Sequence, residues 1–452
     1  MNFIEQLTSF VGADDPYDYR LSDVRELQLA AAHQRFERAR GAMPVLDRRA
    51  SDCGIEKITQ VRDLVPLMFS DATYKSYPDS FIAQRKWNAL GAWLDALSTS
   101  AGAAQLNYDG VTDIDGWIAR LADHGHTVYV SSGTSGRCSI FQVSQADREM
   151  DVRGFRSAWR WKAGVQPDRS RPVFALMPRS GAHRMMDTFG IVVRDFGRPD
   201  ATYFLSDTPL LVSEVNRMAR LSKDIAAGTA TPGDIHAAEL AVAAKQAASR
   251  EAMRRMGEAV TRHRDEPSFF VGTWAPMFAL AQAAKTSGLV GGLHPDTLFQ
   301  TGGGLKGAVL PNDYREQIES ILGLKPARNL SLYGMTELTP FMPQCAAGHY
   351  HLPPWHVALV LDKSGEQLLA PEDGRVSGRL AFFDVSMDGH WGALVSGDHG
   401  TLQLTPCACG RRGPSLLHDI VRYRDLPGGD DKVSCAGTID TYVRGVIGGE
   451  TL

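Results

Sequence analysis

The sequence lacks the features of a membrane or secreted protein. None of its 452 residues lies in a run approaching the roughly 18 apolar residues that a transmembrane helix needs. Met1 to Tyr19 contains three aspartates but no basic stretch followed by an apolar one, so it does not resemble a signal peptide. Six cysteines in so long a chain do not make a disulfide scaffold. We therefore expect a cytoplasmic protein without a membrane span.

An excess of charge of one sign is also missing. The formal net charge is -4, and there is neither a basic excess nor a basic stripe of the kind that binds a phosphate backbone. Nucleic acid is therefore not an expected partner. Internal repeats and low-complexity linkers are absent as well. The hydrophobic content of 43% is enough for a large core, and the length suggests two or three structural units.

The first hundred residues carry mostly helical patterns. Leu21 to Met43 has apolar residues at intervals of three and four, and Pro44 follows as a stop signal. Phe81 to Leu97 predicts another helix, after the conspicuous segment from Met68 to Pro78. Farther along, the alanine-rich and charged stretch from Asp234 to Arg264 predicts one long amphipathic helix on the surface.

From about residue 125 the pattern changes to short apolar runs separated by helical stretches. These runs are Thr127 to Val130, Val173 to Leu176, Ile191 to Val193, Phe269 to Val271, Thr297 to Gln300 and Ser331 to Leu332. Such alternation predicts an α/β architecture with largely parallel sheets.

Beyond Pro353, short strands with turns predict a small β subdomain. The expected strands are His356 to Leu361, Gly378 to Asp384 and Ala393 to Ser396. The stretch from Pro406 to Leu452 is rich in glycine and cysteine and too short for a further domain. We expect four parts: residues 1–120 (helical), 121–352 (the α/β core), 353–405 (the β subdomain) and 406–452 (a short tail).

A loop of small and hydroxyl residues follows the first of these strands. It consists of Ser131, Ser132, Gly133, Thr134, Ser135, Gly136 and Arg137. Backbone amides of such a loop can surround phosphate oxygens, the hydroxyls add donors, and glycine permits close approach. It is not the P-loop pattern of nucleoside triphosphatases, and alone it can be an ordinary turn.

Three further polar or glycine-rich segments follow strands. They are Tyr333-Gly334-Met335-Thr336-Glu337, Gly302-Gly303-Gly304-Leu305-Lys306 and Ser396-Gly397-Asp398. An aromatic ring can stack on a nucleobase, a carboxylate can hold Mg²⁺, and another can accept from ribose hydroxyls. Each alone can be a turn, but together they predict a nucleotide site at the carboxyl edge of a sheet.

In order and spacing these motifs resemble the core motifs of the acyl-adenylate-forming superfamily, over about residues 125 to 445. The branch most similar is that of the luciferase-associated acyl-protein synthetases and phenylacetate-CoA ligases. The features pointing to it are Tyr74 to Pro78, Thr301 to Lys306, and Cys407-Ala408-Cys409-Gly410-Arg411. The resemblance implies a large domain of two mostly parallel sheets with helices and a small β subdomain, with a truncated C-terminal domain.

The resemblance also implies roles for the motif residues. The loop from Ser131 to Arg137 would bind the ATP phosphates. Tyr333, with its neighbours Gly334 and Met335 and the glycines at 302, 303 and 304, would border the adenine.

Three side chains would complete the nucleotide site by the same resemblance. Thr336 would contact the α-phosphate, Glu337 would hold Mg²⁺ and Asp398 would bind the ribose. ATP and Mg²⁺ are therefore the expected cofactors.

The sequence departs from the superfamily in two respects. A lysine commonly ends the phosphate loop, but here the corresponding position is Ser139. The hinge-like stretch from Asp430 to Gly445 is followed by only seven residues, so the usual catalytic lysine of the C-terminal domain has no counterpart. Lys306 or Lys432 is the expected substitute for the missing positive charge.

Cys435 is a candidate acyl acceptor. Luciferase-associated synthetases carry an acyl-accepting cysteine near the C-terminus, and Lys432 to Ala436 is a possible counterpart. A thiolate attacks a mixed anhydride readily, and the resulting thioester remains reactive enough to pass the acyl group on. The alternative is a buried structural cysteine.

A second group of cysteines and histidines predicts a metal site. Cys345, His351, Cys407 and Cys409 offer three thiolates and one imidazole, a set that completes a tetrahedral structural zinc site. His349 is the alternative histidine. If no metal binds, these cysteines are small buried hydrophobic residues.

By the same resemblance, His183 and Trp274 are the candidate residues of the acyl pocket, because each follows a predicted strand at a position where related enzymes place pocket residues. Ordinary packing is the alternative for both.

The leading hypothesis is an ATP-dependent ligase that activates a fatty or aryl acid and transfers the acyl group to CoA, a carrier protein or its own cysteine. An acyl reductase is a plausible partner. The alternatives are an amide synthetase with an amine acceptor and a nucleotide-binding subunit of a fatty-acid reductase complex.

Overall fold

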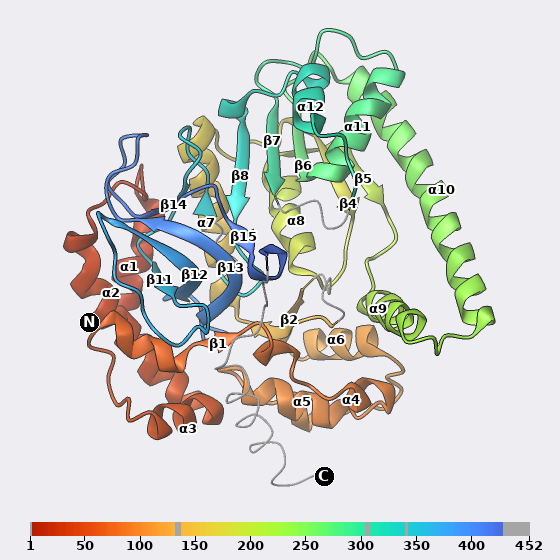
Figure 1. The fold of residues 1–452 in the computed structure, drawn as a ribbon. Coiled ribbons are helices and arrows are strands. Elements are labelled where there is room, and N and C mark those ends of the chain that lie inside the picture. The colour runs from red at the N-terminus through yellow and green to blue at the C-terminus, as the bar shows by residue number, and fades with distance from the viewer. Residues whose placement is uncertain (1, 132–136, 303–307, 340–341, 428–452) are drawn as a thin grey trace. The chain divides into compact units, whose positions relative to one another are not determined.

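The computed structural model describes residues 2–131, 137–302, 308–339 and 342–427. The chain divides into two compact units, each built from separate stretches of sequence (Figure 1). The first comprises Met1–Tyr129, Ser139–Ser157 and Gly334–Leu452, and the second comprises Val130–Cys138 and Ala158–Tyr333.

The first unit opens with six α-helices, as its helical patterns predicted. They are α1 (Phe3–Thr8), α2 (Leu21–Ala42), α3 (Pro44–Asp52), α4 (Asp79–Ala83), α5 (Trp87–Ala96) and α6 (Ile114–Asp123). Pro44 follows the end of α2 as expected and also begins α3. The first position of a helix suits proline because the amide it lacks would have no partner there.

The single helix predicted from Phe81 to Leu97 is wrong. The chain forms α4 and α5 instead, and Arg85 between them has a φ of 55°. A residue in this left-handed region cannot continue a right-handed helix. The apolar spacing gave no sign of the break.

A seven-stranded sheet forms the rest of the first unit's core. Its path is β10-β14-β13-β12-β11, and β1 and β15 also pair with β13. The bounds are β1 (Phe69–Ser70), β10 (Tyr350–His351), β11 (His356–Leu361), β12 (Arg375–Asp384), β13 (Ala393–Gln403), β14 (Ser415–Leu416) and β15 (Val421–Arg422). All pairs are antiparallel except β1 with β13. The three strands predicted after Pro353 are therefore confirmed.

Three further short strands lie outside the seven-stranded sheet. They are β2 (Thr127–Val130) and β3 (Ile140–Val143), which pair with each other, and β9 (Met342–Pro343).

The second unit is built on a parallel sheet. Its strands run in the order β5-β4-β6-β7-β8, and every neighbouring pair is parallel. The bounds are β4 (Arg171–Pro178), β5 (Gly197–Ser206), β6 (Phe269–Thr273), β7 (Leu298–Gly302) and β8 (Asn329–Tyr333). Four of these strands overlap a predicted run, whereas β5 was not predicted.

Helices cover both faces of the parallel sheet. They are the end of α7 (Gln145–Ala163), α8 (Arg184–Phe196), α10 (Pro232–Arg262), α11 (Trp274–Thr286) and α12 (Tyr314–Leu322). Helix α9 (Val212–Ala226) contacts α10 instead. Side chains of α10, α11 and α12 pack with Phe174 and Phe270 on one face, whereas those of α7 and α8 pack with Val173 and Phe269 on the other. Neighbouring residues of one strand thus point into opposite cores.

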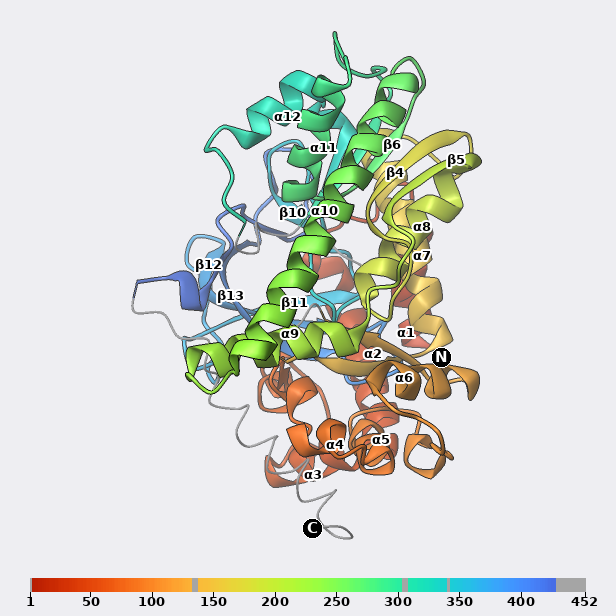
Figure 2. The same ribbon diagram turned by 90° about the vertical axis from the view of Figure 1, so that its right-hand side faces the viewer.

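The strand predicted at Ile191 to Val193 is wrong, because this run lies inside α8. Ile191 and Val192 are buried on that helix, and a run of three apolar residues does not distinguish a strand from a buried helical face. The predicted long helix is confirmed as α10, which extends past α11 to α9 (Figure 2). Within the described residues, no helix is long and apolar enough to cross a membrane.

Candidate nucleotide and metal sites

Residues predicted for the nucleotide site lie in both units. In the second unit, the carboxyl ends of β6, β7 and β8 are adjacent, since Thr273 pairs with Gly302 and Gly302 with Leu332. Trp274 and Tyr333, the next residues along the chain, therefore lie at the same edge of the sheet. This is the edge at which α/β proteins bind nucleotides.

The start of the predicted phosphate loop is also in this unit. Val130 forms a parallel bridge with His183, and its amide donates to the carbonyl of Ala182 at 3.1 Å. Ser131 and Arg137, the described ends of the loop, are both half-buried. The loop thus begins beside the segment that follows β4.

The two candidate pocket residues have different surroundings. His183 is 2% exposed and is the residue before α8. Trp274 begins α11, with the ring of Tyr314 at 6.0 Å and the guanidinium of Arg315 4.8 Å above its own ring. Their part in binding an acid stays a prediction.

Some of the predicted residues lie outside the described part of the chain. They are Ser132, Gly133, Thr134, Ser135, Gly136, Gly303, Gly304, Lys306, Lys432 and Cys435.

In the first unit, the segment after β8 carries a buried carboxylate. Gly334, Met335 and Thr336 are half-buried, but Glu337 is only 6% exposed. The Leu338 amide donates to the carbonyl of Met335 at 3.2 Å and closes the turn that holds Glu337.

Polar residues from two distant segments surround Glu337. Burial is the main cause that raises the pKa of its carboxyl, and the nearby charge of Asp71 raises it further. Lys75 and Ser139 act in the opposite direction. Lys75 Nζ is 2.7 Å from Asp71 Oδ2. Carboxylate oxygens such as those of Glu337 are the ligands that a hard cation such as Mg²⁺ prefers.

Sequence reasoning missed Asp71 and Lys75 as neighbours of Glu337. Their spacing of four residues signals a local ion pair, but only the folded chain brings them to the Glu337 turn. Ser139, the position where a lysine was expected, lies near Glu337 instead and lowers the pKa of its carboxyl.

Asp398 lies in β13 and is 8% exposed. It pairs in register with Arg422 of β15, whose Nε is 3.0 Å from Asp398 Oδ1. The Asp398 amide donates to Ser396 Oγ at 3.1 Å, which fixes the bend of the strand here. Arg422 was not predicted, although it is the charge that faces this carboxylate.

The four predicted metal ligands form one buried cluster. The ligand atoms of Cys345, His351, Cys407 and Cys409 all lie within 4.8 Å of one another. The sulfurs of Cys345 and Cys407 are 3.8 Å apart, and Cys409 Sγ is 3.3 Å from His351 Nε2. Tetrahedral zinc with Zn–S bonds of about 2.3 Å separates two sulfurs by about 3.8 Å. The donor set and its spacing therefore fit a zinc ion.

The alternative histidine, His349, lies beside this cluster. Its Nδ1 is 3.3 Å from Cys407 Sγ and 3.4 Å from Ser415 Oγ. It is therefore placed to hydrogen-bond a ligating thiolate, the kind of contact that orients metal ligands.

The N-terminal segment is attached to the loop that carries Cys407 and Cys409. Arg411 hydrogen-bonds Cys409 and forms an ion pair with Asp15 at 2.9 Å. Arg412 makes two hydrogen bonds from its guanidinium to Asp18, at 2.9 and 3.0 Å. The metal cluster thus lies where the first and last described segments of this unit meet.

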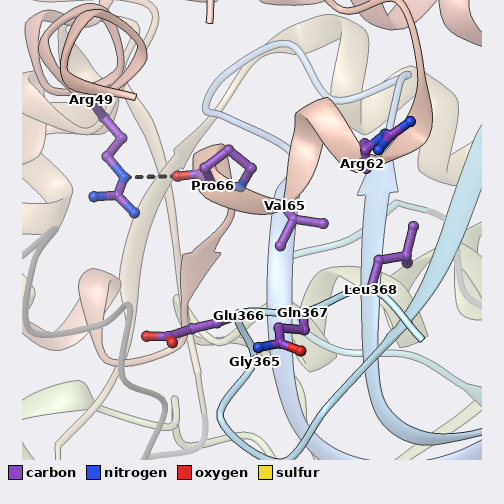
Figure 3. Close-up of a pocket in the computed structure, with 8 residues that line it drawn as sticks. All are labelled: Arg49, Arg62, Val65, Pro66, Gly365, Glu366, Gln367 and Leu368. Carbon is purple, nitrogen blue, oxygen red and sulfur yellow. Dashed lines mark hydrogen bonds between the residues drawn. The ribbon is translucent and has the colours of Figure 1, made fainter. Parts of the chain in front are cut away.

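A separate open pocket of about 470 Å³ lies in the first unit (Figure 3). It is lined by Arg49, Arg62, Val65, Pro66 and the turn from Gly365 to Leu368. The Nε of Arg49 donates to the Pro66 carbonyl at 2.7 Å. The lining contains none of the predicted site residues that the structure describes, so its volume gives no measure of the acid.

Comparison with known proteins identifies the fold. No model of a protein family and no curated protein matches the sequence. Two matching solved structures are of 2-hydroxyisobutyryl-CoA ligase with 2-HIB-AMP and CoA, one in an open conformation and one in the thioesterification state. They are each 15% identical, with TM-scores of 0.53 and 0.55. The matches cover 92% and 91% of this chain and 74% and 72% of theirs. The predicted α/β fold is therefore confirmed, and it resembles the fold of these ligases. Of the two sheets expected to be mostly parallel, only the sheet with the order β5-β4-β6-β7-β8 is parallel, whereas the seven-stranded sheet is mainly antiparallel.

Proposed function

We propose that the protein activates a carboxylic acid with ATP. A carboxylate oxygen of the acid attacks the α-phosphorus and forms a new P–O bond. The bond from the α-phosphorus to the oxygen bridging to the β-phosphate breaks, and pyrophosphate leaves with the electron pair. The products are an acyl-AMP and pyrophosphate.

The observation that carries this proposal is the buried Glu337 at the end of the β8 segment. A carboxylate with so little exposure needs a positive partner. The raised pKa of Glu337 indicates that its surroundings disfavour an uncompensated negative charge. Mg²⁺ bound to ATP supplies that charge and prefers oxygen ligands. When bound, the ion offsets the negative charge that develops on the phosphates during attack.

The other nucleotide contacts are proposed from position. The phosphate loop from Ser131 to Arg137 would bind the phosphates, and Thr336 would donate to the α-phosphate. Tyr333 would border the adenine. Asp398, already held by Arg422, would accept from the ribose hydroxyls.

A thiol is the proposed acceptor of the acyl group. Sulfur attacks the acyl carbon, the bond to AMP breaks, and AMP leaves as a thioester forms. The thiol is that of CoA, a carrier protein or Cys435, as in the acyl-protein synthetase and phenylacetate-CoA ligase branch that the motifs resemble. An acyl reductase partner would consume a protein-bound thioester.

Zinc is the proposed occupant of the cluster formed by Cys345, His351, Cys407 and Cys409. Three thiolates and one imidazole fill all four tetrahedral positions, so the ion would be structural and would leave no position for substrate.

The test of adenylation is a pyrophosphate-release screen against fatty and aryl acids, with Glu337→Gln as the diagnostic variant. We expect this variant to lose at least about a hundredfold in rate, the loss typical of removing one electrostatic contact in an active site. Glu366→Gln, at an exposed turn of the same unit, is the matched control and should retain activity. Unchanged release in Glu337→Gln would remove the proposed metal contact.

Intact mass spectrometry then identifies the acceptor. A mass gain equal to the acyl group, present in the wild type and absent in Cys435→Ser, establishes transfer to this cysteine. Pyrophosphate release without a covalent adduct retires Cys435, and CoA, a carrier protein and amines are then tested in turn.

A further inference from the structure

A second buried carboxylate, Asp384, contacts the segment that carries Glu337. Asp384 is the last residue of β12 and is fully buried. It pairs in register with His356 at the start of β11, and His356 Nε2 is 3.5 Å from Asp384 Oδ2. None of the sequence motifs includes either residue.

Asp384 accepts hydrogen bonds from both sides. The amide of Thr339 donates to Oδ2 at 2.6 Å. The amide and hydroxyl of Ser386 donate to Oδ1 at 2.9 and 2.5 Å. Hydrogen bonds to an ionised acceptor are the shorter and stronger kind, so this contact with Thr339 is a firm one.

The carbonyl of Thr339 is held as well. His356 Nε2 donates to it at 2.9 Å, and Ser386 Oγ is 3.1 Å away. Both backbone polar groups of Thr339 are thus held by residues of the β11 and β12 segments. Thr339 is two residues after Glu337, with the fully buried Leu338 between them.

Placing an ionised carboxylate in a dry interior costs free energy that a neutral acceptor for the Thr339 amide would avoid. An ionised acceptor that binds several donors restricts the position of a chain segment, and this restriction can offset the cost. A metal-binding carboxylate needs such definition, because a site that is loose by about 1 Å loses its function.

We propose that Asp384, with His356 and Ser386, is a positioning residue that fixes the Thr336–Thr339 turn so that Glu337 can hold the divalent cation of the nucleotide. Asp384 itself touches neither nucleotide nor metal. The inference rests on the proposed function for its effect on catalysis, but not for its effect on the turn.

The test variant is Asp384→Asn, and the matched control is Asp147→Asn. Asp147 is also a buried carboxylate of the first unit and accepts from the amides of Ser144, Asp388 and Gly389, but it does not contact Thr339. Both variants are assayed well below their unfolding midpoints. The Mg²⁺ concentration for half-maximal pyrophosphate release is measured separately from the KM for the acid.

We expect Asp384→Asn to raise the half-maximal Mg²⁺ concentration about tenfold to a hundredfold, as loss of outer hydrogen bonds does at other metal sites. The KM for the acid should not change, and Asp147→Asn should leave the Mg²⁺ dependence unaltered. His356→Gln, which retains a donor for the Thr339 carbonyl, should have a smaller effect than Asp384→Asn. An unchanged Mg²⁺ dependence in Asp384→Asn, or equal shifts in both aspartate variants, would overturn the proposal.

Hydrogen exchange separates this inference from the proposed function. Amides of the Thr336–Thr339 turn should exchange faster in Asp384→Asn than in the wild type and in Asp147→Asn, whether or not the protein forms an adenylate. If the wild type releases no pyrophosphate with any acid, the proposed function fails while exchange still tests the turn. If exchange of these amides is unchanged in Asp384→Asn, the positioning role is wrong.

Discussion

At the scale of the residue, the pKa values of two buried aspartates of the first unit are shifted in opposite directions. Burial alone would raise the pKa of Asp384, but the facing His356 and hydrogen bonds from Ser386 and Thr339 hold it below the usual 3.8. For Asp147, burial outweighs the hydrogen bonds from Ser144, Asp388 and Gly389 and raises the pKa to about 6. At both residues burial raises the pKa and hydrogen bonds lower it. The lowering contributions outweigh burial at Asp384, whereas burial outweighs them at Asp147.

Asp384 should therefore stabilise the fold at neutral pH and lose this effect in acid. Its folded-state pKa lies below its unfolded value, so the contribution is present above about pH 4 and disappears as the pH falls through the folded pKa. We expect Asp384→Asn to lose about 3 kcal/mol or more at pH 7. The gap in urea midpoint between wild type and variant should narrow as the pH is lowered. A gap that is constant with pH contradicts an ionised Asp384.

Asp147 should show the opposite trend. Its folded state binds a proton more tightly than its unfolded state, so its contribution to stability rises as the pH falls from about 6 to about 4. Relative to Asp147→Asn, the wild type should gain stability over this interval, measured as urea midpoints at several pH values. A loss over the same interval would show that the carboxyl is ionised throughout.

At the scale of the element, α10 and α11 are in close contact at a glycine. A Cβ built on Gly257 of α10 would lie 2.7 Å from the backbone carbon of Ala283 in α11. Backbone cannot move aside as a flexible side chain can. Gly257→Ala should therefore separate the two helices and cost about 1–3 kcal/mol in the free energy of unfolding.

The matched control is Gly190→Ala in α8, where a Cβ meets no atom within 4 Å. Removing a helical glycine there should stabilise the protein by up to about 1 kcal/mol. Thermal unfolding of the two variants should shift in opposite directions. A shift in the same direction would mean that helix propensity and not the contact with α11 governs Gly257.

Regular elements were predictable where the period of the sequence was clear. The α10 pattern persisted over many turns, and four of the five strands β4 to β8 overlap a run that the sequence predicted as a strand, so these elements were found. The helix break at Arg85 and the helical location of Ile191 depend on tertiary packing that a short run does not encode. Strand β5 was missed although Thr202 to Leu205 is a run of β-branched, aromatic and aliphatic residues, because its first half, Gly197 to Asp200, contains glycine, proline and aspartate, which are unfavourable in strands.

The candidate site likewise contains some residues that the sequence could indicate and others that it could not. Motifs that follow a strand, such as the one ending in Glu337, could be found because local pattern and chemistry coincide there. The residues that tune this carboxylate or fix its turn, Asp71, Ser139 and Asp384, come from segments far away in sequence. No local spacing connects them. The cluster of Cys345, His351, Cys407 and Cys409 was an exception, because cysteine and histidine can be recognised as candidate metal ligands from residue type alone, even when they are far apart in the sequence.

At the scale of the whole molecule, the metal cluster should determine the stability of the first unit. We expect one zinc per chain by elemental analysis and its loss in Cys407→Ser. Binding of a structural zinc contributes about 10 kcal/mol or more in small domains, so this variant should unfold at a clearly lower temperature. Cys53→Ser, outside the cluster, is the control and should retain zinc. If the wild type contains no zinc and its thermal unfolding does not respond to chelators, the metal site is wrong and the cysteines are small buried hydrophobic residues.

The position of Cys407 and Cys409 also sets the order in which the protein can be completed during synthesis. The second unit draws nearly all its residues from one continuous stretch, Ala158–Tyr333, and emerges whole from the ribosome. The segment with Asp15 and Asp18 emerges long before its partners Arg411 and Arg412. Domains generally fold as units once their residues are available. The segment with Asp15 and Asp18 is thus among the last to reach its native contacts, and ribosome-bound chains that stop before Cys407 should have a folded second unit but a protease-sensitive N-terminal segment.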